Sequence, residues 1–403
     1  MAQPQSSAAT ASAASTTAAV AAGQAVDGGP HPGPVVILLG PSRSAVSGVS
    51  THVNSLFASP LAKSFNLHHF QVGSEGRREG PLRRLLRLCF SPLALAWRII
   101  ADQALLVHIN TSLNRRAFWR DLAYLLVARA CGARVIYQVH GGLLPQQFCA
   151  ENHLPPSLLR AVLRQPEAIV VLAQCELAAY RKFVPECPVA VLANGIDCAP
   201  YLGLVRQEVP QSEPLRLVYI GRLAREKGLF EAVEGFAQAL EQGLAARLTI
   251  AGSGPEEAAL KALVAERGLA ARVSFPGPVF GAAKLDLLAA SDLLLLPTYA
   301  EGLPYTLLES MAAGVPPITT EVGAIPDVVT EGVHGLFVPP RDPEAIAQAL
   351  ILLAANRPAL ERMRGACLRR IVQGYSVAAL AGEFARLYRA VCYLGRVRRL
   401  SES

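Results

Sequence analysis

The chain alternates between short apolar runs and longer segments with helical spacing. Val35 to Leu39 is a continuous apolar run, followed by a loop rich in glycine, serine and proline and then by a helical segment over 51–61. Short apolar runs bounded by turn residues are typical of strands that are buried on both faces. Repetition of this strand–loop–helix unit predicts a parallel, doubly wound α/β sheet. The other strand candidates in this half are 105–109, 134–139, 168–172 and 189–192.

The same alternation starts again after residue 214. The segment 201–214 is polar, contains proline and shows no periodicity, which predicts a linker. The pattern therefore predicts two α/β domains, over 35–200 and 201–375, and a final helix near 377–399 with one apolar face. The strand candidates of the second domain are 215–220, 247–251, 273–275, 293–296 and 317–319.

The first 34 residues do not share this pattern. They consist mainly of alanine, serine, threonine, glycine and proline, with one charged residue and no aromatic residue, so 1–34 is predicted to be a disordered leader. The leader lacks the basic start and the leucine-rich core of a secretory signal. No window holds eighteen uninterrupted apolar residues, so no membrane-spanning helix is predicted.

Composition narrows the ligand class and the compartment. A chain of 403 residues with 52% hydrophobic and 17% charged residues can build two cores of ordinary size. Its net charge of +7 favours an anionic partner, but 6% aromatic residues and the lack of a nucleic-acid motif argue against nucleic acid. The eight cysteines form no C-x-x-C pair, which predicts reduced thiols in a cytosol and no metal site.

The segment 292–317 is the strongest candidate for ligand binding. An apolar run ends at Pro297, a tight Gly-Leu-Pro turn follows at 302–304, and a helix is predicted through Glu309. The free amides at the start of that helix suit an anion. Glu301 in the loop and Glu309 in the helix are placed to reach different parts of one ligand. The alternative is a surface loop and helix with two solvated glutamates.

Two more candidates follow predicted strands. The loop G-R-L-A-R-E-K-G over 221–228 places Arg222 and Lys227 where both can bind one diphosphate, the alternative being a solvated basic turn. His140 stands at the carboxyl end of the predicted strand 134–139, where parallel strands face the ligand crevice. The alternative for His140 is a buried structural histidine.

Two glycines are weaker candidates. Gly252 follows the strand 247–251 within Gly-Ser-Gly, and either a plain turn or a ligand contact explains it. Gly48 lies in the first strand-to-helix loop, where its amide can approach a diphosphate.

These motifs resemble family 4 retaining glycosyltransferases, which have the GT-B fold of two Rossmann-like domains facing a cleft. The segment 292–317 is similar to the donor-site signature of that family, and 221–228 matches its G-R-x-x-x-x-K-G motif. The His140–Gly141 pair and the Gly-x-Gly turn at Gly252 are also similar, while Ser47 replaces the first of two glycines usual before Gly48. The resemblance implies that the second domain binds the donor, that the first binds the acceptor, and that 376–403 crosses back to the first domain.

The resemblance also implies a role for each candidate residue. Glu301 and His140 contact the donor sugar, and Glu309 binds the ribose hydroxyls. The Gly302 and Leu303 amides hold sugar hydroxyls and phosphate, whereas Arg222 and Lys227 neutralise the leaving diphosphate. The reaction is transfer from a nucleotide diphosphate sugar with retention, through an oxocarbenium-like transition state. No Asp-x-Asp motif is present, so neither a metal nor a further cofactor is expected.

The acceptor and the location follow only by analogy. The run H-I-N-T-S over 108–112, with the His-Gly-Gly loop, resembles bacterial exopolysaccharide and capsule-assembly transferases, whose acceptors are lipid-linked saccharides. Their likeness implies a cytoplasmic enzyme at the inner face of the plasma membrane. Two alternatives stay open: a GT-B nucleotide-sugar 2-epimerase, and an inactive scaffold that binds sugar nucleotide or membrane.

A basic stretch over 77–98 bears on membrane attachment. Within it, Leu82, Leu85, Leu86 and Phe90 share one helical face. Such a helix fits an anionic membrane surface, but an ordinary amphipathic helix packed on its sheet explains the pattern as well. The arginines of this stretch are Arg77, Arg78, Arg83, Arg84, Arg87 and Arg98.

Overall fold

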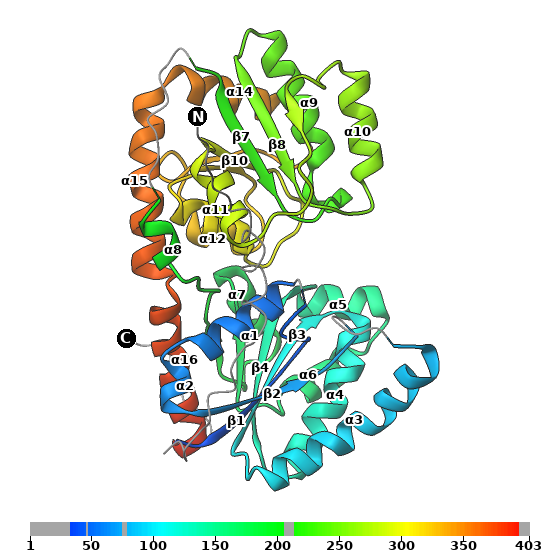
Figure 1. Cartoon of the computed structure of the whole chain (residues 1–403). Helices are drawn as coiled ribbons and strands as arrows, with labels where there is room; N and C mark the ends of the chain where they lie inside the picture. Colours follow the sequence, from blue (N-terminus) through cyan, green and yellow to red (C-terminus); the bar gives the residue numbers. More distant parts are fainter. Residues whose placement is uncertain (1–32, 46, 75–78, 205–212, 395–403) are drawn as a thin grey trace, which may run out of the picture.

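Two parallel six-stranded sheets form the framework of the chain (Figure 1). The computed structural model describes residues 33–45, 47–74, 79–204 and 213–394. The predicted leader over 1–34 except its last two residues, most of the predicted linker, Arg77, Arg78 and the last residues from 395 therefore lie outside the described residues. The side chains of Arg83, Arg84 and Leu85 lie outside them as well.

The first sheet has the strand order β2-β1-β3-β4-β5-β6, and every neighbouring pair is parallel. Its strands are β1 (Val35–Gly40), β2 (Asn66–Gln71), β3 (Leu106–Leu113), β4 (Arg134–Gly142), β5 (Ala168–Val171) and β6 (Val189–Val191). Its helices are α1 (Gly48–Ala58), α2 (Leu61–Ser64), α3 (Pro81–Ala101), α4 (Arg115–Ala130), α5 (Pro145–Asn152), α6 (Pro156–Leu163) and α7 (Gln174–Phe183).

The second sheet repeats the scheme with the order β12-β11-β10-β7-β8-β9, again all parallel. Its strands are β7 (Leu215–Ile220), β8 (Ala246–Ala251), β9 (Val273–Ser274), β10 (Leu293–Leu296), β11 (Pro317–Thr319) and β12 (Leu336–Phe337). The helical elements are α8 (Ala199–Leu202), the 3₁₀ turn η1 (Arg225–Lys227), α9 (Leu229–Glu241), α10 (Glu257–Glu266), α11 (Gly281–Ala289), α12 (Tyr305–Ala312), α13 (Ile325–Val328), α14 (Pro343–Ala355), α15 (Arg357–Gly374) and α16 (Val377–Leu394).

Strand order determines where a ligand can bind. Each sheet reverses its direction of growth beside its first strand, between β1 and β3 in one sheet and between β7 and β10 in the other. The loops that leave the carboxyl ends of strands diverge at such a point and open a crevice. The two doubly wound sheets confirm the predicted α/β class. The sequence pattern missed β2 and β12, which are edge strands with half-buried residues rather than apolar runs.

The chain crosses between the sheets twice at nearly the same place. Ile196, in the first crossing, accepts a hydrogen bond from Val377 N at 2.8 Å and donates one to Tyr375 O at 2.9 Å. Beyond this point α16 runs along the first sheet (Figure 1). Phe384 and Tyr388 of α16 are fully buried in the same apolar cluster as Val36 of β1. The first sheet therefore obtains part of its core from the end of the chain.

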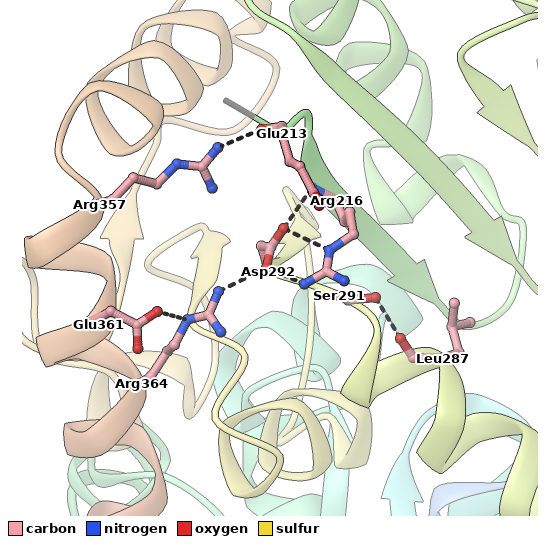
Figure 2. A network of polar contacts seen from close by, with 8 residues as sticks. All are labelled: Glu213, Arg216, Leu287, Ser291, Asp292, Arg357, Glu361 and Arg364. Carbon is pink, nitrogen blue, oxygen red and sulfur yellow. Dashed lines mark hydrogen bonds and ion pairs between the residues drawn. The ribbon is translucent and has the colours of Figure 1, made fainter. Parts of the chain in front are cut away.

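A buried carboxylate attaches α15 to the second sheet (Figure 2). Asp292 is fully buried and accepts hydrogen bonds from Arg216 Nη2 at 2.9 Å and from Arg364 Nη2 at 2.8 Å. Burial alone would raise the pKa of Asp292, but the two guanidinium groups hold the pKa below its usual value. Arg216 comes from β7 and Arg364 from α15, so this pairing connects the long helix to the centre of the sheet.

Candidate functional site

A cleft of about 1030 Å³ lies where the switch points of the two sheets face each other. Its walls come from the β1–α1 loop, the end of β4, the turns after β7 and β8, and the segment from Glu301 to Glu309. Every predicted site residue lines this one cleft: His140, Glu301, Gly48, Arg222, Lys227, Gly252, Gly302, Leu303 and Glu309. The structure thus brings together residues far apart in sequence, while their individual roles stay predictions.

The segment after β10 has the predicted strand–turn–helix form. Helix α12 begins at Tyr305 with Pro304 as its N-cap, so its first amides lack intrahelical partners. A Cβ on Gly302 would lie 3.3 Å from the backbone oxygen of His140. Glycine therefore allows the loop of the second domain to approach the end of β4 closely. Asn194, which is buried in the first crossing, donates to Leu303 O at 2.8 Å and holds the loop in place.

The His140 ring is held in place by Asn110 of the neighbouring strand β3. Its Nε2 lies 2.8 Å from Asn110 Oδ1, while Asn110 Nδ2 donates to Leu39 O at 3.0 Å. Because a carbonyl oxygen only accepts, the Asn110 amide has one orientation, and Nε2 of His140 must carry the proton. Burial, together with His52 and His108 nearby, keeps the pKa of His140 well below its ordinary value. His140 is therefore a neutral imidazole at neutral pH.

The cations of the cleft are paired with carboxylates. Lys227 forms an ion pair with Glu301, and Arg222 pairs with Glu226. The third pair joins Lys284 Nζ to Glu309 Oε1 at 2.5 Å. The Arg222 and Glu226 side chains are 64% and 42% exposed, so this ion pair contributes little to stability. A bound anion can therefore readily replace Glu226 as the partner of Arg222. The Lys227–Glu301 pair is mostly buried and joins the predicted phosphate and sugar contacts into one unit.

The two glycines differ in what the structure demands. A Cβ on Gly252 would lie 1.8 Å from Gly221 O, so a close backbone approach requires glycine whether or not a ligand binds there. At Gly48 the nearest atom to an added Cβ is Tyr305 Cδ2 at 3.9 Å. Gly48 is therefore not required by packing within the chain.

Several residues that line the cleft or contact its lining residues are not indicated by any sequence motif. Lys284 and Phe280 belong to α11 and the turn before it, a segment without a recognisable motif. Asn110 lies within the H-I-N-T-S run, but only the fold shows that its side chain contacts His140. Tyr305 directly follows the Gly-Leu-Pro turn, and its position as first residue of α12 was the one available signal.

Comparison with known proteins supports the resemblance. Residues 204–367 match the model of the family described as "Glycosyl transferases group 1". WcaL of Escherichia coli strain K12, assigned as a colanic acid biosynthesis glycosyltransferase, is 31% identical over 206 residues, which cover 49% of this chain and 50% of WcaL. Glycogen synthase of Mycobacterium tuberculosis strain H37Rv is 29% identical over 202 residues, 50% of this chain and 48% of that protein. The chain spans about half the length of the curated relatives it matches.

Solved structures share the fold over nearly the whole chain. Sucrose-phosphate synthase from Thermosynechococcus elongatus superposes with a TM-score of 0.71 at 20% identity, covering 89% of this chain and 99% of that one. Anabaena Alr3699/HepE in complex with UDP-glucose gives 0.68 at 16% identity, covering 88% and 99%. The predicted GT-B fold is confirmed, and the resemblance to group 1 glycosyltransferases holds for the second domain.

Proposed function

We propose that this GT-B protein, with its group 1 second domain, transfers a sugar from a nucleotide diphosphate sugar to an acceptor with retention of configuration. One observation carries the proposal: three cations (Arg222, Lys227 and Lys284), two carboxylates and a neutral imidazole converge in one cleft at the switch points of both sheets. The structure of the neighbour HepE with UDP-glucose supports a nucleotide-sugar donor.

The diphosphate has a binding place beside η1 and the start of α12. Arg222 exchanges the exposed Glu226 for a phosphate oxygen, and its planar guanidinium donates two hydrogen bonds at once. Lys227 adds a point charge, and the free amides of α12 add partial positive charge. As the sugar–phosphate bond breaks, negative charge grows on the leaving diphosphate, and these groups stabilise it. We therefore expect turnover without an added divalent metal.

The sugar lies between the two domains. Glu301 accepts hydrogen bonds from sugar hydroxyls while it stays paired with Lys227. His140 is neutral and donates its Nε2 proton to Asn110, so Nδ1 is the nitrogen with a free lone pair for a hydroxyl. Both residues orient the sugar so that the acceptor meets its reacting carbon on the face of the departing diphosphate.

Thermal unfolding with a panel of nucleotide sugars tests the proposal first. A bound donor should raise the unfolding temperature, because a ligand that binds only the folded state stabilises it. Nucleotide release in the presence of candidate acceptors then tests turnover. Turnover of the donor without any acceptor would favour the epimerase, and binding without turnover would favour the inactive scaffold. Failure of every nucleotide sugar to bind contradicts the proposal.

We further propose a lipid-linked saccharide as acceptor, reached from the cytoplasmic face of an anionic membrane. Leu95 and Ile99 of helix α3 are buried against the first sheet, in one apolar cluster with strand residues such as Val107. The packed-helix interpretation therefore holds for that face of α3. A second face is unpartnered among the described residues, and its large apolar side chains follow helical spacing: Leu82, Leu86, Phe90, Leu93, Trp97 and Ile100. This stripe is longer than the one predicted from 82–90.

Charge favours a membrane over a second copy of the chain as the occupant of this stripe. Helix α3 carries arginines at 83, 84, 87 and 98 and no acidic residue. Arg87 pairs with Glu79 and donates to Ser74 Oγ at 3.0 Å, and Arg98 pairs with Asp102, so neither of these two charges is free. The excess positive charge of the helix therefore comes from Arg83 and Arg84, and it disfavours the meeting of two such faces. No helix within the described ranges is long and apolar enough to cross a bilayer.

A further inference from the structure

Glu309 has a partner that no sequence motif indicates. Lys284, near the start of α11, places its Nζ 2.5 Å from Glu309 Oε1. The two side chains are 21% and 13% exposed, and both residues line the cleft. A charge-assisted contact in such a poorly solvated setting is stronger and better ordered than an ion pair on the surface.

A second donor approaches the same carboxylate from outside the residues that line the cleft. Tyr201 belongs to α8, just after the first crossing between the sheets, and its hydroxyl is in hydrogen-bonding reach of Glu309. Burial, the negative charge of Glu309 and this hydrogen bond together raise the pKa of Tyr201. Tyr201 therefore stays a protonated phenol whose hydroxyl can donate to Glu309.

We infer that Lys284 is a positioning residue that fixes the Glu309 carboxylate for two neighbouring ribose hydroxyls, so that the cleft selects ribonucleotides over 2′-deoxyribonucleotides. The inference rests on the proposed function and deepens it. A carboxylate that accepts from two hydroxyls at once must be ionised and held in one orientation. Lys284 and Tyr201 supply that restraint before the ligand arrives, which lowers the entropy lost on binding.

Removal of the ammonium group should free the orientation of Glu309. Without Lys284, a mostly buried carboxylate loses its counter-charge, and the neighbouring Tyr305 side chain is only partly buried. The carboxyl group can then rotate towards water, so it presents both oxygens to the ribose hydroxyls less of the time. Ribonucleotide affinity should therefore fall.

Calorimetry with free nucleotides tests this inference without knowledge of the sugar or the acceptor. UDP, GDP and ADP are each titrated into the full chain beside their 2′-deoxy counterparts. For the base that binds best, Lys284→Met should lower ribonucleotide affinity roughly tenfold and change 2′-deoxynucleotide affinity less than about threefold. Lys284→Arg should retain most of the affinity, and Tyr201→Phe should show a smaller loss with the same preference for the ribonucleotide.

Lys261→Met is the matched control. Lys261 pairs with Glu257 at 2.7 Å within α10, outside the cleft, so its loss should leave both affinities unchanged.

The outcomes separate this inference from the function it rests on. Equal losses for the ribo and 2′-deoxy forms in Lys284→Met would overturn the inference and indicate that Lys284 contacts the phosphates or the base directly. An affinity for Lys284→Met within twofold of wild type would overturn it as well. If no nucleoside diphosphate bound the wild-type chain, the proposed function itself would fail.

Discussion

Lys227 and Glu301 are partners before any ligand arrives, so a change at one alters the other. Loss of the lysine leaves Glu301 as an uncompensated charge in a mostly buried place, and loss of the glutamate frees Lys227 to bind other anions. Kinetic effects at these two positions will therefore not add independently. Arg222 has an exposed partner and should behave more simply.

The first residue-scale prediction concerns the phosphate contacts. Arg222→Ala removes a charge-assisted hydrogen bond to the leaving diphosphate and should cost about 1.5–3 kcal/mol of transition-state stabilisation, roughly tenfold to a few hundredfold in kcat/KM. Lys227→Ala should cost at least as much, because it also releases Glu301. Steady-state rates at limiting and saturating donor measure both effects. Arg247→Ala, an exposed arginine on β8 outside the cleft, is the control. Near-normal turnover in both cleft variants would refute the assignment.

The second residue-scale prediction separates the two carboxylates. Glu309→Gln should weaken binding of the free nucleotide diphosphate about tenfold, because its charge-assisted bonds to the ribose are lost. Glu301→Gln should not weaken nucleotide binding, because it frees Lys227 for the diphosphate, and should depress kcat, since Glu301 faces the sugar. Calorimetry with the nucleotide alone, beside rate measurements with the donor, distinguishes the two. Equal loss of nucleotide affinity in both variants would contradict this division of roles.

Residues next to strand ends were predictable, and residues that meet only through the fold were not. Arg222 and Glu301 follow strands, and His140 lies near the carboxyl end of β4. Each belongs to a short motif, so the sequence alone places all three at the crevice. Lys284 reaches Glu309 across the space between two helices, a contact that no spacing in the sequence encodes. Asn110 is a strand residue whose partner lies on the neighbouring strand, and register determines that pairing.

At the scale of elements, α3 carries the prediction on membrane binding. The double variant Phe90→Ser, Trp97→Ser should bind anionic vesicles at least tenfold more weakly. Both side chains are exposed, and burial of each in the membrane interface contributes roughly 1 kcal/mol or more to the binding free energy. Binding should need anionic lipid and weaken as salt rises, since screening reduces the attraction of the basic residues.

The matched control for α3 lies in the other half of the molecule. Leu352 on α14 is 59% exposed, comparable to Phe90, so Leu352→Ser should leave vesicle binding unchanged. Co-sedimentation with vesicles measures binding, and sedimentation velocity without lipid measures the oligomeric state. A double variant that dissociates a dimer and binds vesicles like the wild type would show that α3 meets a second copy.

Element prediction succeeded where burial was complete and failed at the edges. Strands such as β5 and β10 are buried on both faces and read as apolar runs. The edge strand β2 contains His68 and His69 and is half-buried throughout, so its composition does not differ from that of a loop. The extension of the α3 stripe to Ile100 was missed because Pro92 and Arg98 interrupt the apolar pattern.

At the scale of the whole molecule, the buried Asp292 predicts how stability depends on α15. Asp292→Ala leaves Arg216 and Arg364 without their shared partner and should lower the free energy of unfolding by about 3 kcal/mol. Urea denaturation at neutral pH measures the loss. Asp286→Ala, at an exposed carboxylate of α11, should change stability by less than about 0.5 kcal/mol.

The pH dependence of this contribution has a definite sign. The folded pKa of Asp292 lies below its unfolded value, so the stabilisation is fully present above the unfolded pKa of about 3.9. It is lost progressively as the pH falls through the folded pKa. The difference in stability between wild type and Asp292→Ala should therefore be constant near neutrality and shrink in acid. A difference that grew as the pH fell would contradict the pairing.

The place of α16 also constrains the order in which the molecule can be made. During synthesis the strands of the first sheet leave the ribosome early, but Phe384 and Tyr388, which fill part of their core, emerge only after the whole second sheet. The nascent first domain must therefore wait with an open apolar surface while the second domain folds. Translation speed and chaperones acting on that interval should affect the yield of this protein more than they would for domains completed in sequence order.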